Sequence, residues 1–146
     1  MRLGTIAGLI ALLAVATPGA LPATDEATPK TKPGDGIGCM MAVMSAVRRV
    51  GRVCYPGKDP EFQGQVDISV AQLERWSMRY GHQSAADIAK FEAEQGLDRW
   101  PEPELCKSAG PAQLYSAMRA AGAAKVKAMS DAMTAGPGKA TFGDCF

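Results

Sequence analysis

Every cysteine of this chain lies beyond an apolar N-terminal leader, and this order constrains the fold more than any other feature of the sequence. The leader begins with Arg2 and continues as 14 uncharged residues, 3–16 (LGTIAGLIALLAVA). A helix of this length is too short to cross the roughly 30 Å apolar layer of a bilayer. Small residues at 14–16, 20 and 23 suit a signal peptidase. We therefore expect residues 1–23 to be a cleaved signal peptide, which leaves no membrane span in a periplasmic or secreted protein.

The cysteines therefore reach an oxidising compartment, in which thiols tend to form disulfides. They are Cys39, Cys54, Cys106 and Cys145. If residues 38–54 form one helix, Cys39 and Cys54 lie roughly 22 Å apart along its axis, whereas a disulfide requires Cα atoms within about 7 Å. The pairing 39–54 with 106–145 is thereby excluded. Two pairings remain open: 39–106 with 54–145, or 39–145 with 54–106.

The spacing of the cysteines argues against a metal or redox role. Zinc sites favour two cysteines separated by two to four residues, and thioredoxin-like chemistry uses C-x-x-C. Neither pattern occurs in this sequence. We therefore expect two structural disulfides, which staple the helix at 38–54 to the C-terminal half of the chain, and no cofactor.

Length and charge limit the class of protein further. Removal of residues 1–23 leaves 123 residues, enough for one domain with one hydrophobic core. The whole chain has 16 Lys and Arg against 15 Asp and Glu, and Arg2 is lost with the leader. Because nucleic-acid binders usually carry a basic surplus, we expect no nucleic-acid partner. Frequent Ala, Gly and Arg favour a bacterial origin.

The segment after the leader is rich in Pro and Gly and has no apolar periodicity. Such a segment buries too little apolar surface to offset the entropy lost on ordering. The sequence therefore predicts a disordered linker at 24–36 and a helical domain at 37–146.

Residues 38–54 (GCMMAVMSAVRRVGRVC) show the clearest helical pattern. At 100° per residue, the cysteines, the valines and most methionines fall on one side of the helix, and Arg48, Arg49 and Arg52 fall on the other, with Met41 among them. We expect the first side to pack into the core and the arginines to be exposed. Replacing all three arginines should then change stability little.

Capping signals predict two further helices. Ser69 and Gln72 resemble a capping box that begins a helix, which Gly81 closes in a left-handed conformation. Ser84 and Asp87 resemble a second capping box, for a helix that runs to about residue 96.

The C-terminal half completes an all-α domain of four to five helices. A short helix is expected at 103–106 and a long one at 111–134, with Gly122 as a place for a bend. The tail after residue 135 contains too much Gly and Pro to be helical and should fold back onto the domain, because it ends in Cys145.

Methionines beside Cys39 offer one route to function. Met40, Met41 and Met44 carry soft thioether sulfurs of the kind that bind Cu(I). Methionine also fills irregular gaps in helical cores, and Met40 and Met44 share a side with the valines. We expect core packing and keep copper handling as an alternative.

The arginine cluster offers a second route. Clustered guanidinium groups suit carboxylates, so Arg48, Arg49 and Arg52 are the expected contacts for an acidic partner.

No set of catalytic residues stands out in the sequence. The sequence thus favours a non-enzymatic helical protein that binds a protein or cell-envelope partner. A hydrolase of an envelope polymer is a further alternative, which requires two carboxylates beside an aromatic ring. The oligomeric state is left open.

Overall fold

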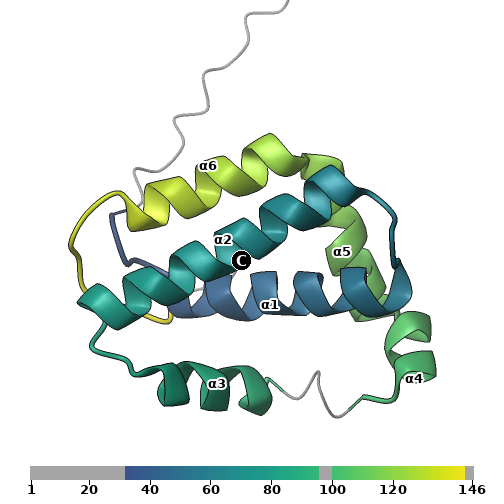
Figure 1. Ribbon diagram of the computed structural model, residues 1–146, viewed down its shortest axis with the longest axis horizontal. Helices are drawn as coiled ribbons and strands as arrows, with labels where there is room; N and C mark the ends of the chain where they lie inside the picture. The colour runs from purple at the N-terminus through teal and green to yellow at the C-terminus, as the bar shows by residue number, and fades with distance from the viewer. Residues whose placement is uncertain (1–31, 96–99, 144–146) are drawn as a thin grey trace, which may run out of the picture.

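The computed structural model describes residues 32–95 and 100–143 (Figure 1). This part of the chain contains helices and no strand, which confirms the all-α prediction. The helices are α1 (Ile37–Cys54), α2 (Pro60–Tyr80), α3 (Ala85–Glu94), α4 (Glu102–Lys107), α5 (Ala109–Ala121) and α6 (Ala123–Thr134). These six exceed the expected four to five, because Gly122 divides the long helix predicted at 111–134 into α5 and α6. The signal peptide expected at 1–23 lies outside the described residues.

Helices α1 and α2 make most of the contacts between helices in the described residues. Helix α1 contacts α2, α4 and α5, while α6 packs on α2 (Figure 1). The core lies mainly between α1 and α2, and it includes Met44, Val47 and Val50 from the predicted apolar side of residues 38–54. Its fully or almost fully buried side chains include Met44, Val47, Val50, Val66, Val70, Leu73, Leu105, Tyr115 and Val126.

Helix α2 begins nine residues before the predicted capping box. Pro60 occupies its first turn, where a missing N–H costs nothing. Ser69 therefore lies within the helix, and its buried hydroxyl forms a 3.0 Å hydrogen bond with the hydroxyl of Ser130 on α6. Gln72 reaches α6 as well, donating to Thr134 Oγ1 at 2.6 Å. The predicted start was wrong because Ser69 and Gln72 join two helices instead of capping one.

Gly122 ends α5 and precedes α6. Its backbone has φ 85° and ψ 163°, a combination that is open almost only to glycine. A side-chain Cβ at this position would meet nothing within 4 Å, so the backbone angles and not lack of space require glycine. The break lets α6 turn back along α2 (Figure 1).

The N-terminal and C-terminal segments meet beside the start of α1. The Gly34 amide donates to the Met133 carbonyl at 2.8 Å, and the Thr141 amide donates to the Gly34 carbonyl at 3.0 Å. The Cys39 amide donates to the Phe142 carbonyl at 3.2 Å. The tail thus folds back, as predicted, as far as residue 143. Residues 24–31 of the expected 24–36 linker lie outside the described residues, while Gly34 within it is held by the contacts with Met133 and Thr141.

One disulfide joins described residues. Cys54 at the end of α1 is bonded to Cys106 in α4, with Cα atoms 5.3 Å apart. This bond excludes the pairing 39–106 with 54–145. Cys39 is buried and is not a free thiol, whereas Cys145 lies outside the described residues. The second bridge, 39–145, stays a prediction.

Helix α3 begins at the predicted capping box. The Ser84 hydroxyl accepts a 3.1 Å hydrogen bond from the Asp87 amide, and the Asp87 carboxylate accepts one of 2.8 Å from the Ser84 amide. The expected left-handed residue was Gly81, but Gly81 has φ −86° and the exposed His82 takes φ 57° instead. Within residues 32–95 and 100–143, no helix has the length and apolar character needed to span a bilayer.

Candidate functional site

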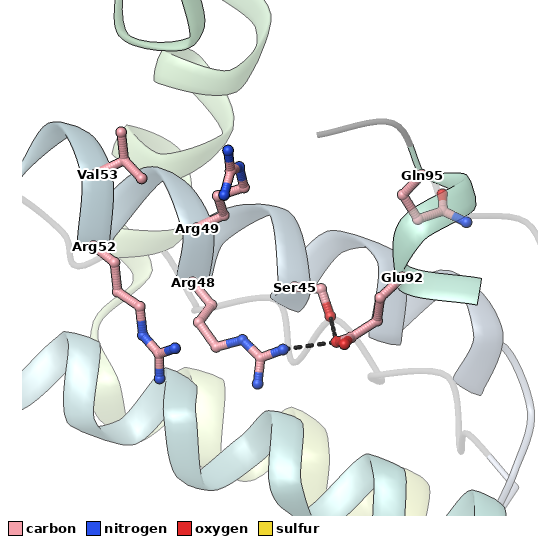
Figure 2. Close-up of a pocket in the computed structure, with 7 residues that line it drawn as sticks. All are labelled: Ser45, Arg48, Arg49, Arg52, Val53, Glu92 and Gln95. Atoms are coloured by element: carbon pink, nitrogen blue, oxygen red, sulfur yellow. Dashed lines mark hydrogen bonds and ion pairs between the residues drawn. The ribbon is translucent and has the colours of Figure 1, made fainter. Parts of the chain in front are cut away.

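The three arginines of α1 line a pocket between α1 and α3 (Figure 2). The pocket has a volume of about 270 Å³. Figure 2 shows Arg48 and Arg52 extending toward α2, while Arg49 extends the other way. The wall is completed by Ser45 and Val53 of α1, and by Glu92 and Gln95 at the end of α3. The structure thus brings the predicted arginine cluster together with one carboxylate.

Arg48 is the most enclosed of these arginines, with a side chain that is 22% exposed. Its Nη2 donates to Oε1 of Glu92 at 2.7 Å, and its Nη1 lies 3.6 Å from Oε1 of Glu74 on α2. The Ser45 hydroxyl donates to the same Glu92 oxygen at 2.8 Å. Arg48 therefore links three helices. The expectation of a solvent-exposed arginine face was wrong for Arg48, beside which α3 packs, and also for Arg49, which is partly buried; only Arg52 is exposed.

Burial and neighbouring charges of both signs act on the pKa of the Glu74 carboxyl. Partial burial raises the pKa of this carboxyl above the usual value of 4.5, and the negative charge of Glu92 raises it further. Arg48 and Arg75 act in the opposite direction without cancelling this increase. Glu74 and Glu92 thus form a carboxylate pair that shares one guanidinium. Sequence reasoning did not single out this pair, since its members lie on different helices.

Arg52 lies at the solvent side of the cluster. Its side chain is 60% exposed, and its Nη2 donates to Oδ1 of Asp67 on α2 at 2.7 Å. Exposed ion pairs of this kind contribute at most about 1 kcal/mol and exchange readily with other partners. Arg52 is therefore more available than Arg48 to an incoming acidic group.

The methionines considered for copper lie in or against the core. Met41 is 3% exposed and Met44 is fully buried, while Met40 is partly buried and packs against the core. The Ser77 hydroxyl of α2 donates to Met41 Sδ at 3.1 Å. The expectation that Met41 faces solvent was therefore wrong. The described residues contain no group of three His, Cys, Asp or Glu that could hold a metal ion.

The hydrolase alternative requires two carboxylates beside an aromatic ring, and none of the four best-defined pockets in the described part of the chain is lined by two carboxylates. Glu104 is exposed on α4, and Trp100 is exposed before it. The arginine pocket contains one carboxylate, Glu92, which is already held by Ser45 and Arg48.

A further polar cluster lies beside the disulfide and was missed from the sequence. The ring of Tyr115 on α5 stacks on Tyr55, and its hydroxyl accepts a 3.3 Å hydrogen bond from Gln63. Asp59 lies 3.5 Å from the same hydroxyl and pairs with Arg119 at 3.0 Å. Burial raises the pKa of Tyr115. These contacts tie α5 to the loop between α1 and α2.

Comparison with known proteins gives no match to a protein-family model, to a curated protein or to a solved structure.

Proposed function

We propose that this chain is a non-enzymatic helical protein, exported to the periplasm or the cell exterior, which binds a protein or cell-envelope partner. The observation that carries the proposal is the arginine pocket between α1 and α3. The Cys54–Cys106 bond supports export, because disulfides persist mainly in oxidising compartments.

The pocket suits an acidic group of the partner. Arg48 is fixed at one wall by Glu92, whose carboxylate Ser45 also holds, so the partner does not bear the entropic cost of ordering it. Arg52 is exposed, and a carboxylate of the partner can take the place of Asp67. Guanidinium groups bind carboxylates through two parallel N–H donors, which adds geometric specificity to the charge attraction.

Cross-linking capture tests the proposal. The exported protein is immobilised, incubated with cell-envelope extract and cross-linked, and the adducts are identified by mass spectrometry. The variant R49Q/R52Q removes two pocket charges and leaves Arg48 in place. The control K90Q/K127Q removes two charges from exposed lysines, each of which has an acidic partner one turn away on its own helix.

The proposal predicts one saturable partner for the wild type and the control, and a clear loss of that partner for R49Q/R52Q. Absence of any saturable partner would contradict a binding role. A partner retained in full by R49Q/R52Q would show that the contact lies away from the pocket.

A further inference from the structure

The solvent-facing side of α2 carries a second cluster of arginines, together with exposed apolar side chains. At 100° per residue, Ile68, Arg75, Met78 and Arg79 fall within an arc of about 100°. Ile68 is 59% exposed and Met78 is 41% exposed, and both arginines are exposed. Core residues such as Leu73 lie on the opposite side of the helix. We call these four residues the α2 face.

Within the described part of the chain, no ion pair neutralises the positive charge of the α2 face. Arg48, Arg52 and Arg119 each pair with an acidic side chain. Arg75 and Arg79 form no ion pair with any acidic side chain in residues 32–95 and 100–143. The guanidinium of Arg79 instead lies 5.2 Å from the centre of the Tyr80 ring.

Beside the arginines, the surface forms a shallow hollow of about 580 Å³ between α2 and the end of α6. Hydrogen bonds hold two of its lining residues, Trp76 and Gln72, in place. Trp76 is almost fully buried, and its Nε1 donates to the Gly136 carbonyl at 2.7 Å. Gln72 is held by Thr134. The hollow is therefore formed before a partner arrives, which lowers the entropic cost of binding.

We infer that the α2 face docks an acidic, amphipathic helical segment of a partner protein. Arg75 and Arg79 are one helical turn apart, so two carboxylates spaced four residues apart on a partner helix match their separation. An apolar side chain of the same segment would pack on Met78 or Ile68. Arg and Met are both enriched at protein interfaces. The inference rests on the proposed binding function and adds a second surface and the chemistry of its partner.

A protein segment fits the charge of the α2 face better than a lipid surface does. Recognition of anionic membranes typically uses clusters of about four to eight Lys or Arg. The α2 face has Arg75 and Arg79, and the whole chain has a net charge of only +1.

Titration with a defined peptide tests the inference. The probe is a synthetic alanine-based helix with two Glu four residues apart and one Leu on the same side, and a second probe replaces both Glu by Gln. Amide shifts of the ¹⁵N-labelled protein are followed by NMR during each titration. We expect saturable shifts centred on residues 68–79 with the Glu peptide, and affinity weaker by about tenfold for R75Q/R79Q. The charge-matched control K58Q/K125Q should bind like the wild type.

A charge-reversed pair keeps the test decisive. R75E/R79E should lose the Glu peptide and bind a Lys version of it, and thermal melts should show that the variant remains folded. The inference would be overturned if the Gln peptide bound as tightly as the Glu peptide, or if R75Q/R79Q kept the wild-type affinity. It would also be overturned if the protein bound vesicles with 30% phosphatidylglycerol and did not bind the Glu peptide.

The two proposals fail in different ways. If the partner captured from the envelope extract is lost in R49Q/R52Q but the peptide does not bind the α2 face, the proposed function stands and this inference is wrong. If the peptide binds the α2 face but no saturable partner is captured, the surface is real and the proposed function is wrong.

Discussion

Arg48 on α1 and Glu92 on α3 are joined by a 2.7 Å ion pair, and the same guanidinium faces Glu74 on α2. An arginine placed among solvent-exposed residues by the helical pattern thus holds three helices together. Its neighbour Arg52, one turn later, remains largely exposed. The two arginines differ because Arg48 pairs with carboxylates of both α2 and α3, whereas Arg52 pairs with Asp67 of α2 alone among the described residues.

Substitution of Arg48 should therefore destabilise the fold. R48Q leaves the carboxylates of Glu74 and Glu92 without their shared cation, and hydrogen bonds to charged groups contribute about 1.5–3 kcal/mol. R52Q removes an exposed ion pair and should cost less than about 1 kcal/mol. Urea unfolding of both variants measures the difference. Equal losses would mean that Arg48 is as solvent-exposed as the sequence pattern suggests.

The pH dependence of stability should reveal the raised pKa of Glu74 in the folded protein. Its pKa is raised above 4.5 in the folded protein, so ionisation of this carboxyl costs folding free energy. That cost is absent below pH 4.5 and is complete once the pH has risen past the pKa that Glu74 has in the folded protein. Relative to wild type, E74Q should gain stability as the pH rises from about 4 to 7.

Asp131 on α6 provides a control whose effect on stability has the opposite pH dependence. Hydrogen bonds from Lys127 and Gln72 lower its pKa below 3.8, so its contribution is present above 3.8 and is lost as the pH falls through the folded pKa. D131N should therefore lose stability relative to wild type as the pH rises from about 3 to 5. Unfolding curves from about pH 3 to 7 measure both variants. Parallel pH profiles for E74Q and D131N would contradict the assigned directions.

The break between α5 and α6 should depend on glycine. G122A forces a side chain into a backbone conformation with φ 85°, which costs about 1–3 kcal/mol. Gly110 in α5 has no positive φ and has open space around it, so G110A should stabilise the protein by up to about 1 kcal/mol. Thermal unfolding of both variants provides the comparison. A neutral G122A would show that the two helices can join without this turn.

The sequence predicts those elements whose signals are local. Helix α1 follows from its apolar periodicity, and α3 begins at Ser84 because the reciprocal bonds with Asp87 involve residues three apart. The fold-back of the tail follows from its composition and from its terminal cysteine. The two helix predictions need only neighbouring residues, and the fold-back needs only the rule that cysteines pair in an oxidising compartment.

Elements that depend on distant contacts were not predictable in this way. Ser69 reads as a cap until Ser130, 61 residues later, is placed against it. Met41 falls among the arginines on the helical projection, yet Ser77 and α2 cover it. That Arg75 and Arg79 pair with no acidic side chain of residues 32–95 and 100–143 likewise emerges only from the folded arrangement.

Removal of the Cys54–Cys106 bond should destabilise the protein substantially. The bond spans 52 residues, and on the chain-entropy model closing a loop of this size stabilises by about 4 kcal/mol. C54S/C106S should therefore unfold at markedly lower urea concentration, with α4 released first, since α4 buries a single side chain, that of Leu105. A variant as stable as wild type would show that packing alone holds α4.

Peptide mapping without reduction tests most directly the claim that α1 is tied to the C-terminal half of the chain. Proteolysis of the exported protein, with free thiols blocked, is followed by mass spectrometry of the linked peptides. The account predicts a peptide pair containing Cys54 with Cys106 and a second pair containing Cys39 with Cys145. Recovery of Cys39 with Cys106, or of Cys39 with Cys54, would contradict it.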